Sequence, residues 1–217
     1  MVFATLACTM IDVVDYRAGN SPSVIYALET LGLPCRLVSK PEDLDISERI
    51  ILPGVGAARA TLDSLREGGL LDALEARVQR DGVPFLGICI GLQVLFDRSE
   101  EDDTKCLAWI RGEVRRFADT QRVPQIGWNE VIFTRSHPIT ATLPPSGHFY
   151  FVNSYYAVPT RAEDVLGRTE YGVAFASMVT HANIVATQFH AEKSGELGLR
   201  ILENFATWDA ALDELPC

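Results

Sequence analysis

The chain has 217 residues, of which 47% are hydrophobic and 22% charged, and its formal net charge at pH 7 is -10. This length and apolar fraction predict one globular domain over residues 1–217 with a full core. The acidic balance, without any lysine- or arginine-rich run, argues against a nucleic-acid partner.

The cysteines indicate a reducing compartment. Five are scattered along the chain: Cys8, Cys35, Cys89, Cys106 and Cys217. An odd, scattered set is not a secreted disulfide framework, so we expect a cytoplasmic protein. Residues 1–10 are apolar but lack a basic start and lead directly into a strand-like segment, so we expect no signal peptide. No apolar run reaches transmembrane length, and no membrane partner is expected.

Strand-like and helix-like stretches alternate in the first half. The expected strands are 10–14, 35–39, 49–52 and 83–88, and the expected helices are 22–31 and two stretches within 57–80. Such alternation predicts a parallel sheet flanked by helices. The first helix has Ser21 as a candidate N-cap, Pro22 in its first turn and Gly32 after its end.

The second half is rich in strands. We expect strands at 130–133, 148–152, 155–158, 173–178 and 184–189, with a solvated acidic loop at 98–103. A closing helix over 194–208 carries apolar side chains at helical spacing. The whole pattern predicts an α/β fold with a central, mostly parallel sheet.

A cysteine stands between the fourth expected strand and a following helix, in the sequence Gly87-Ile88-Cys89-Ile90-Gly91. Flanking glycines permit the sharp turn that pushes the central side chain into a cleft, the thiol version of a nucleophile elbow. A helix that starts here also favours the thiolate through its dipole. The alternative is a small cysteine buried in the core.

His190 and Glu192 follow the apolar run 184–187. Residues two apart on an extended chain point to the same side, so the carboxylate can orient the imidazole toward a thiol. Without Cys89, the same two residues would be typical of a solvated surface pair or of a metal site. The other histidines have no ligand spacing, so no metal is expected.

The segment Pro53-Gly54-Val55-Gly56 follows the expected strand at 49–52. It has no Lys-Ser/Thr after it and does not complete a dinucleotide fingerprint. It is either an ordinary tight turn or a loop whose backbone N–H groups bind an oxyanion beside Cys89.

Together these motifs resemble class I glutamine amidotransferases and, among them, the glutaminase subunits of imidazole glycerol phosphate synthase, which acts in histidine biosynthesis and also yields AICAR. The resemblance implies the three-layer α/β fold of that class. The matching stretches are Asp15-Tyr16, Gly19-Asn20, Ser23-Val24, Pro53-Gly54-Val55-Gly56, Gly87 to Gln93, Ile126-Gly127-Trp128-Asn129, Tyr150-Phe151-Val152, Ser154-Tyr155 and Gln188-Phe189-His190.

The resemblance also implies roles. Cys89 attacks the side-chain amide of glutamine, His190 moves the proton from the thiol to departing ammonia, and Glu192 orients His190. The backbone N–H groups of Ile90 and, after a loop rearrangement, Val55 hold the oxyanion. Matching substrate positions are Gly56, Gln93, Glu101, Ser154 and Tyr155, and matching partner positions are Trp128, Asn129, Tyr150 and Lys193.

The implied partner is a cyclase subunit with a (β/α)₈ barrel, which forms a heterodimer with this chain and receives ammonia through its interior. No cofactor is implied. Gln125, Asn153 and Ala191 depart from the family's usual His, His and Pro. Two other functions remain open: a stand-alone cysteine hydrolase of γ-glutamyl bonds, and a non-catalytic thiol sensor in which Cys89 is oxidised.

Overall fold

A computed structural model describes residues 9–17 and 19–210. The expectation about a signal peptide in residues 1–10 therefore falls mainly outside the described residues, as do Cys8 and Cys217. Within the described ranges, no helix combines the length and apolarity that crossing a membrane requires.

Five parallel strands make up one half of the sheet, in the order β2-β1-β3-β4-β13. Their bounds are β1 Ile11–Val14, β2 Cys35–Val38, β3 Arg49–Leu52, β4 Phe85–Ile88 and β13 Ile184–Thr187. Every residue of β1, β3, β4 and β13 is buried, as expected for parallel strands covered on both faces.

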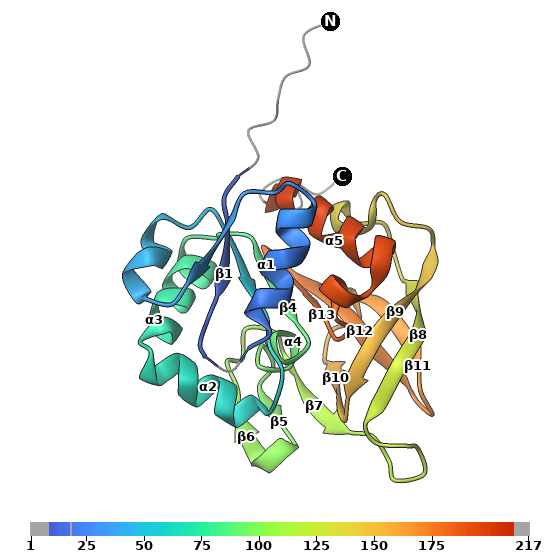
Figure 1. Ribbon diagram of the computed structural model, residues 1–217. Helices are drawn as coiled ribbons and strands as arrows, with labels where there is room; N and C mark the ends of the chain where they lie inside the picture. The colour runs from blue at the N-terminus through green and yellow to red at the C-terminus, as the bar shows by residue number, and fades with distance from the viewer. Residues whose placement is uncertain (1–8, 18, 211–217) are drawn as a thin grey trace, which may run out of the picture.

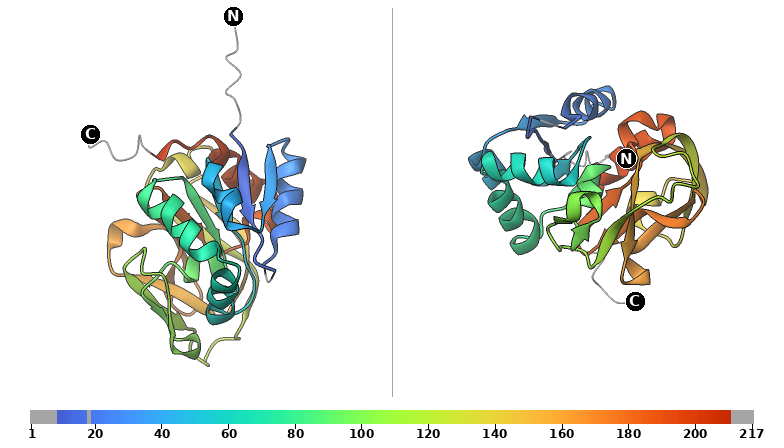
Figure 2. Two further views of the ribbon diagram at one scale, coloured as in Figure 1. Left: turned by 90° about the vertical axis from the view of Figure 1, so that its left-hand side faces the viewer. Right: turned by 90° about the horizontal axis from the view of Figure 1, so that it is seen from below.

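Helices cover both faces of these strands (Figures 1 and 2). Helices α1 (Ser21–Thr30) and α5 (Gly195–Thr207) share one apolar cluster with Ile51 and Leu86. Helices α2 (Ala58–Glu67) and α3 (Leu70–Glu75) share another with neighbouring strand residues such as Ile50 and Phe85. Because successive strand residues point to opposite faces, each strand contributes to both clusters. The predicted three-layer arrangement is confirmed.

A mostly antiparallel region, in which β5 and β7 pair in parallel, continues the sheet beyond β13. Its strands are β12 Ala174–His181, β10 Tyr155–Pro159, β7 Gly112–Arg116, β5 Arg98–Ser99 and β6 Thr104–Lys105 on the main path, and β11 Val165–Glu170, β8 Gln125–Phe133 and β9 Ser146–Asn153 on a branch from β12. The expected strand-rich second half is present. The prediction of a loop at 98–103 was wrong for Arg98 and Ser99, which form β5 and pair with β6 and β7, while the rest of the segment is a turn.

The start of α1 differs from the prediction by one residue. Asn20 is the N-cap and Ser21 is already in the helix, while Pro22 lies in the first turn as expected. The Asn20 side chain makes no capping hydrogen bond to the helix backbone. It donates instead to Glu192, which lies 172 positions later in the chain. Gly32 follows the helix in the left-handed region, with φ 68°.

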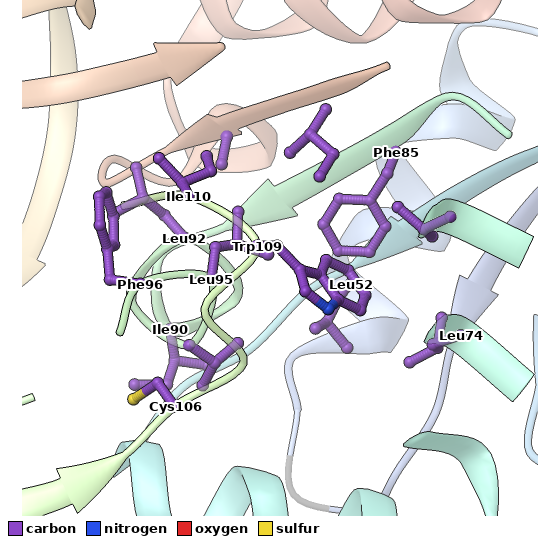
Figure 3. Close-up of a cluster of buried hydrophobic side chains, with 14 of the residues drawn as sticks. Leu52, Leu74, Phe85, Ile90, Leu92, Leu95, Phe96, Cys106, Trp109 and Ile110 are labelled. Atoms are coloured by element: carbon purple, nitrogen blue, oxygen red, sulfur yellow. The ribbon is translucent and has the colours of Figure 1, made fainter. Parts of the chain in front are cut away.

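The segment after Cys89 is fixed by a large apolar cluster, drawn in Figure 3. Ile90 and Leu92 lie in this cluster together with Leu52 of β3. Phe85 and Trp109 pack edge to face in it, with ring centroids 5.7 Å apart. The backbone that carries Cys89 is therefore held by packing over several elements.

Candidate active site

Cys89 lies in a strained turn between β4 and the short helix α4 (Ile90–Gln93), with φ 56° and ψ −104°. A Cβ atom on Gly87 would lie 2.4 Å from the Gly91 carbonyl oxygen. A Cβ atom on Gly91 would lie 2.2 Å from the Leu52 carbonyl oxygen. Only glycine fits at either position, so the backbone has the geometry expected of a nucleophile elbow. The first N–H groups of α4 have no acceptor within that helix.

His190 and Glu192 are in direct contact, with 2.9 Å between Nδ1 and Oε1. Their side chains are only 3% and 1% exposed. The route to this contact differs from the prediction, because β13 ends at Thr187 and residues Ala191–Lys193 form a helical turn rather than extended chain. The His190 N–H donates to the Tyr150 carbonyl at 2.9 Å, which fixes the backbone there.

The ionisation of His190 depends on its two neighbours. Burial alone would lower the pKa of its imidazole. Hydrogen bonds to Cys89 and Glu192, together with their charges, outweigh burial and raise the pKa to about 10. Because Nδ1 faces Glu192, Nε2 is the nitrogen left for Cys89. The arrangement therefore favours the imidazolium form of His190 at neutral pH.

We expect His190 to stay protonated at neutral pH and to lose its proton near pH 10. Since its folded pKa lies above the ordinary 6.5, its stabilisation is fully present below pH 6.5 and is lost as the pH rises through about 10. NMR titration with isotope-labelled histidine can follow it among four imidazoles, and His190→Asn identifies its signal. Cys89→Ala should lower this pKa. An unchanged value would contradict the pairing.

A cavity of about 310 Å³ lies beside Cys89 and His190. Its lining includes Cys89, His190 and all of the expected substrate and oxyanion positions, namely Val55, Gly56, Ile90, Gln93, Glu101, Ser154 and Tyr155. Glu192 does not line the cavity and contacts it only through His190. A larger hollow of about 880 Å³ runs along residues 133–145 and contains none of these groups. The smaller cavity is therefore the candidate site.

Two of the expected substrate positions are held by hydrogen bonds. The Gln93 amide Nε2 donates to the Tyr155 carbonyl at 3.3 Å and to Gln188 Oε1 at 3.0 Å. The Glu101 carboxylate accepts from the Ala58 N–H at 2.9 Å, at the start of α2. Each side chain is therefore oriented before any ligand enters, with a carboxylate available at the cavity wall.

Two polar residues that reach the site were absent from the predicted set. Gln188 is fully buried, and its Nε2 lies 3.7 Å from the Cys89 sulfur as a hydrogen-bond donor. Asn20 donates to Glu192 Oε1 at 2.9 Å. Both stand in motif stretches. The sequence around a polar residue at a buried strand end or before a helix, however, does not show which side chain that residue will contact.

The expected partner positions cluster on the β8–β9 ribbon and beside it. Trp128 is 55% exposed and lies across from Tyr150, with ring centroids 6.1 Å apart. Asn129 donates to the Glu170 carbonyl at 2.9 Å. Lys193 is exposed and reaches the cavity lining. These residues form a partly apolar surface next to the cavity.

The departures from the family pattern at Gln125, Asn153 and Ala191 are all buried. Gln125 and Asn153 are directly opposite each other on β8 and β9. Asn153 lines the cavity, and its amide donates to the Tyr155 carbonyl at 2.9 Å. Ala191 is fully buried in the turn before α5. Across the described ranges, no group of three or more His, Cys, Asp or Glu side chains has the arrangement of a metal site.

Comparison with known proteins gives a consistent assignment. Residues 12–208 match the family described as glutamine amidotransferase class-I. The chain is 46% identical over 197 residues to the imidazole glycerol phosphate synthase subunit HisH of Dehalococcoides mccartyi strain CBDB1, covering 90% of this chain and 96% of that protein. It is 41% identical over 208 residues to the HisH subunit of Chloroflexus aurantiacus, covering 94% and 98%.

Solved structures agree on the fold. A glutamine amidotransferase crystal structure superposes with a TM-score of 0.72 at 22% identity, covering 90% of this chain and 99% of that chain. PurLQS from Thermotoga maritima gives a TM-score of 0.69 at 19% identity, covering 91% and 97%. At these identities the structures support the fold, and the sequence relatives support the narrower family. The chain therefore belongs to the class I glutamine amidotransferases and, within them, to the family of imidazole glycerol phosphate synthase HisH subunits.

Proposed function

We propose that this chain is the glutaminase subunit that supplies ammonia to imidazole glycerol phosphate synthase, with Cys89, His190 and Glu192 as its triad. The observation that carries the proposal is the buried contact between His190 and Glu192, with His190 and Cys89 lining the same cavity. The names of the relatives support the pathway.

The reaction begins with the proton on His190 and the negative charge on Cys89. The sulfur attacks the side-chain carbonyl carbon of glutamine, and the carbonyl electron pair moves onto oxygen. Nε2 of His190 then gives its proton to the nitrogen as the C–N bond breaks, which releases ammonia and leaves a glutamyl thioester. Neutral His190 next removes a proton from water. The hydroxide attacks the thioester, glutamate leaves, and the sulfur regains its charge.

The cavity residues suit the rest of the substrate. The Ile90 N–H, at the start of α4, and the Val55 N–H, after rearrangement of its loop, would donate to the developing oxyanion. Glu101 supplies a negative charge for the ammonium group of glutamine, and Gly56, Gln93, Ser154 and Tyr155 complete the binding wall. No step needs a metal or an organic cofactor.

We propose further that residues 1–217 act as one domain in the cytoplasm and form a heterodimer with a (β/α)₈ cyclase. Trp128, Asn129, Tyr150 and Lys193 would contact the cyclase, and ammonia would pass into the barrel. The exposed Trp128 ring beside the cavity supports this side as the docking surface.

The test compares glutamine hydrolysis by the isolated chain with hydrolysis by the complex carrying the cyclase's own ligand. If the Val55 N–H joins the oxyanion site only in the complex, its gain should raise the rate by roughly 10²–10³-fold. Equal rates with and without the cyclase would favour a stand-alone γ-glutamyl hydrolase. Absence of hydrolysis in both, with reversible oxidation of Cys89, would favour a thiol sensor.

A further inference from the structure

Asn20 links the first helix to the catalytic acid. It stands 172 positions before Glu192 in the chain, yet its Nδ2 lies 2.9 Å from Glu192 Oε1. The same carboxylate oxygen accepts the hydrogen bond from His190 Nδ1. Asn20 does not line the cavity, so it acts on the reaction only through Glu192.

The orientation of the Asn20 amide is set by Ser23. The Ser23 hydroxyl donates to Asn20 Oδ1 at 2.7 Å. With the amide oxygen engaged there, the NH₂ group must face Glu192. The opposite orientation would place the amide oxygen against a carboxylate oxygen, which is repulsive. An N-cap asparagine normally accepts from a backbone N–H of its own helix, but this one makes no such bond.

The Glu192 carboxylate has few other donors. Its side chain is 1% exposed, and Oε2 has no hydrogen-bond partner among the described residues. A buried carboxylate stays ionised only where donors or positive charge stabilise it. His190 and Asn20 supply the two hydrogen bonds on Oε1. Losing one of these hydrogen bonds would leave the Glu192 side chain less firmly oriented and its carboxylate with one donor fewer.

We propose that Asn20 is a positioning residue that holds the Glu192 carboxylate aimed at His190, with Ser23 orienting its amide. This inference rests on the proposed function of the triad. It extends the triad by two residues into the N-terminus of α1.

The test uses the full chain with isotope-labelled histidine and follows the His190 pKa by NMR. Asn20→Ala should lower that pKa, because Glu192 is no longer held against the imidazole. Ser23→Ala should lower it less, since the amide remains but loses its orienting partner. Asn204→Ala is the matched control, because Asn204 bonds the Ile139 carbonyl and Thr142 far from the site, and should leave the value unchanged.

Activity with glutamine in the cyclase complex gives the second readout. Asn20→Ala should lower kcat by roughly 10–100-fold, the effect of losing one hydrogen bond to a charged group, with KM unchanged. Asn20→Asp separates positioning from helix capping. Aspartate is a good N-cap and should preserve thermal stability, but it places a second carboxylate beside Glu192 and should lower kcat at least as much as alanine.

An unchanged His190 pKa in Asn20→Ala, while Glu192→Gln lowers it, would overturn the role of Asn20 and leave the triad intact. If Glu192→Gln also leaves the pKa and kcat unchanged, the proposed triad itself fails. A loss of activity in Asn20→Asp that follows only a loss of thermal stability would assign Asn20 a structural role.

Discussion

Replacement of Cys89 by alanine is expected to lower glutamine hydrolysis by roughly 10⁴–10⁶-fold, because no other group can form the thioester. The fold should survive, since the side chain is small and Gly87 and Gly91 keep the turn. Synthesis of imidazole glycerol phosphate from added ammonia by the complex should be retained. The measurement is the rate with glutamine and with ammonium salt, on the same preparation.

The other described cysteines are the natural controls. Burial raises the pKa of Cys106 to about 11 and also raises that of Cys35, so both are poor nucleophiles at neutral pH. Cys35→Ala and Cys106→Ala should keep glutaminase activity. A glutamine analogue with an electrophile at the side-chain carbonyl should label Cys89 alone, and labelling of Cys8, Cys35 or Cys106 with Cys89 untouched would exclude the proposed nucleophile.

Removal of His190 should have the next largest effect. His190→Ala eliminates both the proton donor for ammonia and the base for water, and general acid–base catalysis contributes roughly 10²–10⁴-fold. Glu192→Gln should cost less, because Glu192 lies outside the cavity lining and acts only through the imidazole. The rates of both variants in the cyclase complex, measured at several pH values, decide the order.

His181 offers a matched control for the His–acid pair. It contacts Asp164 at 3.0 Å on another part of the molecule, so His181→Ala should leave the glutaminase rate unchanged. An equal and complete loss in Glu192→Gln and His190→Ala would mean that Glu192 has a direct part in the chemistry.

The sequence predicted the parallel half of the sheet well because buried parallel strands are continuous apolar runs, as in β3 and β4. It did not predict β7 or β11, in which polar residues such as Arg115 and Glu170 interrupt the pattern, nor the two-residue strands β5 and β6. Those strands form because neighbouring strands supply hydrogen-bond partners, which no local pattern encodes.

The candidate site was likewise predicted only in part from the sequence. Motif spacing pointed to the elbow and to the neighbourhood of His190, and the structure brings these together in one cavity. It did not point to Gln188 or to the contact of Asn20 with Glu192, because both depend on which side chain meets which across the core. The predicted N-cap was Ser21 instead of Asn20 for a related reason. The Asn20 amide bonds the distant Glu192 carboxylate and makes no bond to its own helix.

Strand β9 contacts both reacting residues through its main chain. The Tyr150 carbonyl accepts from the His190 N–H at 2.9 Å, and the Val152 carbonyl oxygen lies 3.9 Å from the Cys89 sulfur. The Tyr150 N–H also donates to Ser194 Oγ at 3.0 Å, one turn beyond His190. The Cys89 sulfur and the His190 backbone are thus registered against a single strand. A shift of β9 would therefore alter both contacts at once. Side-chain substitutions along β9 would leave these two main-chain contacts in place.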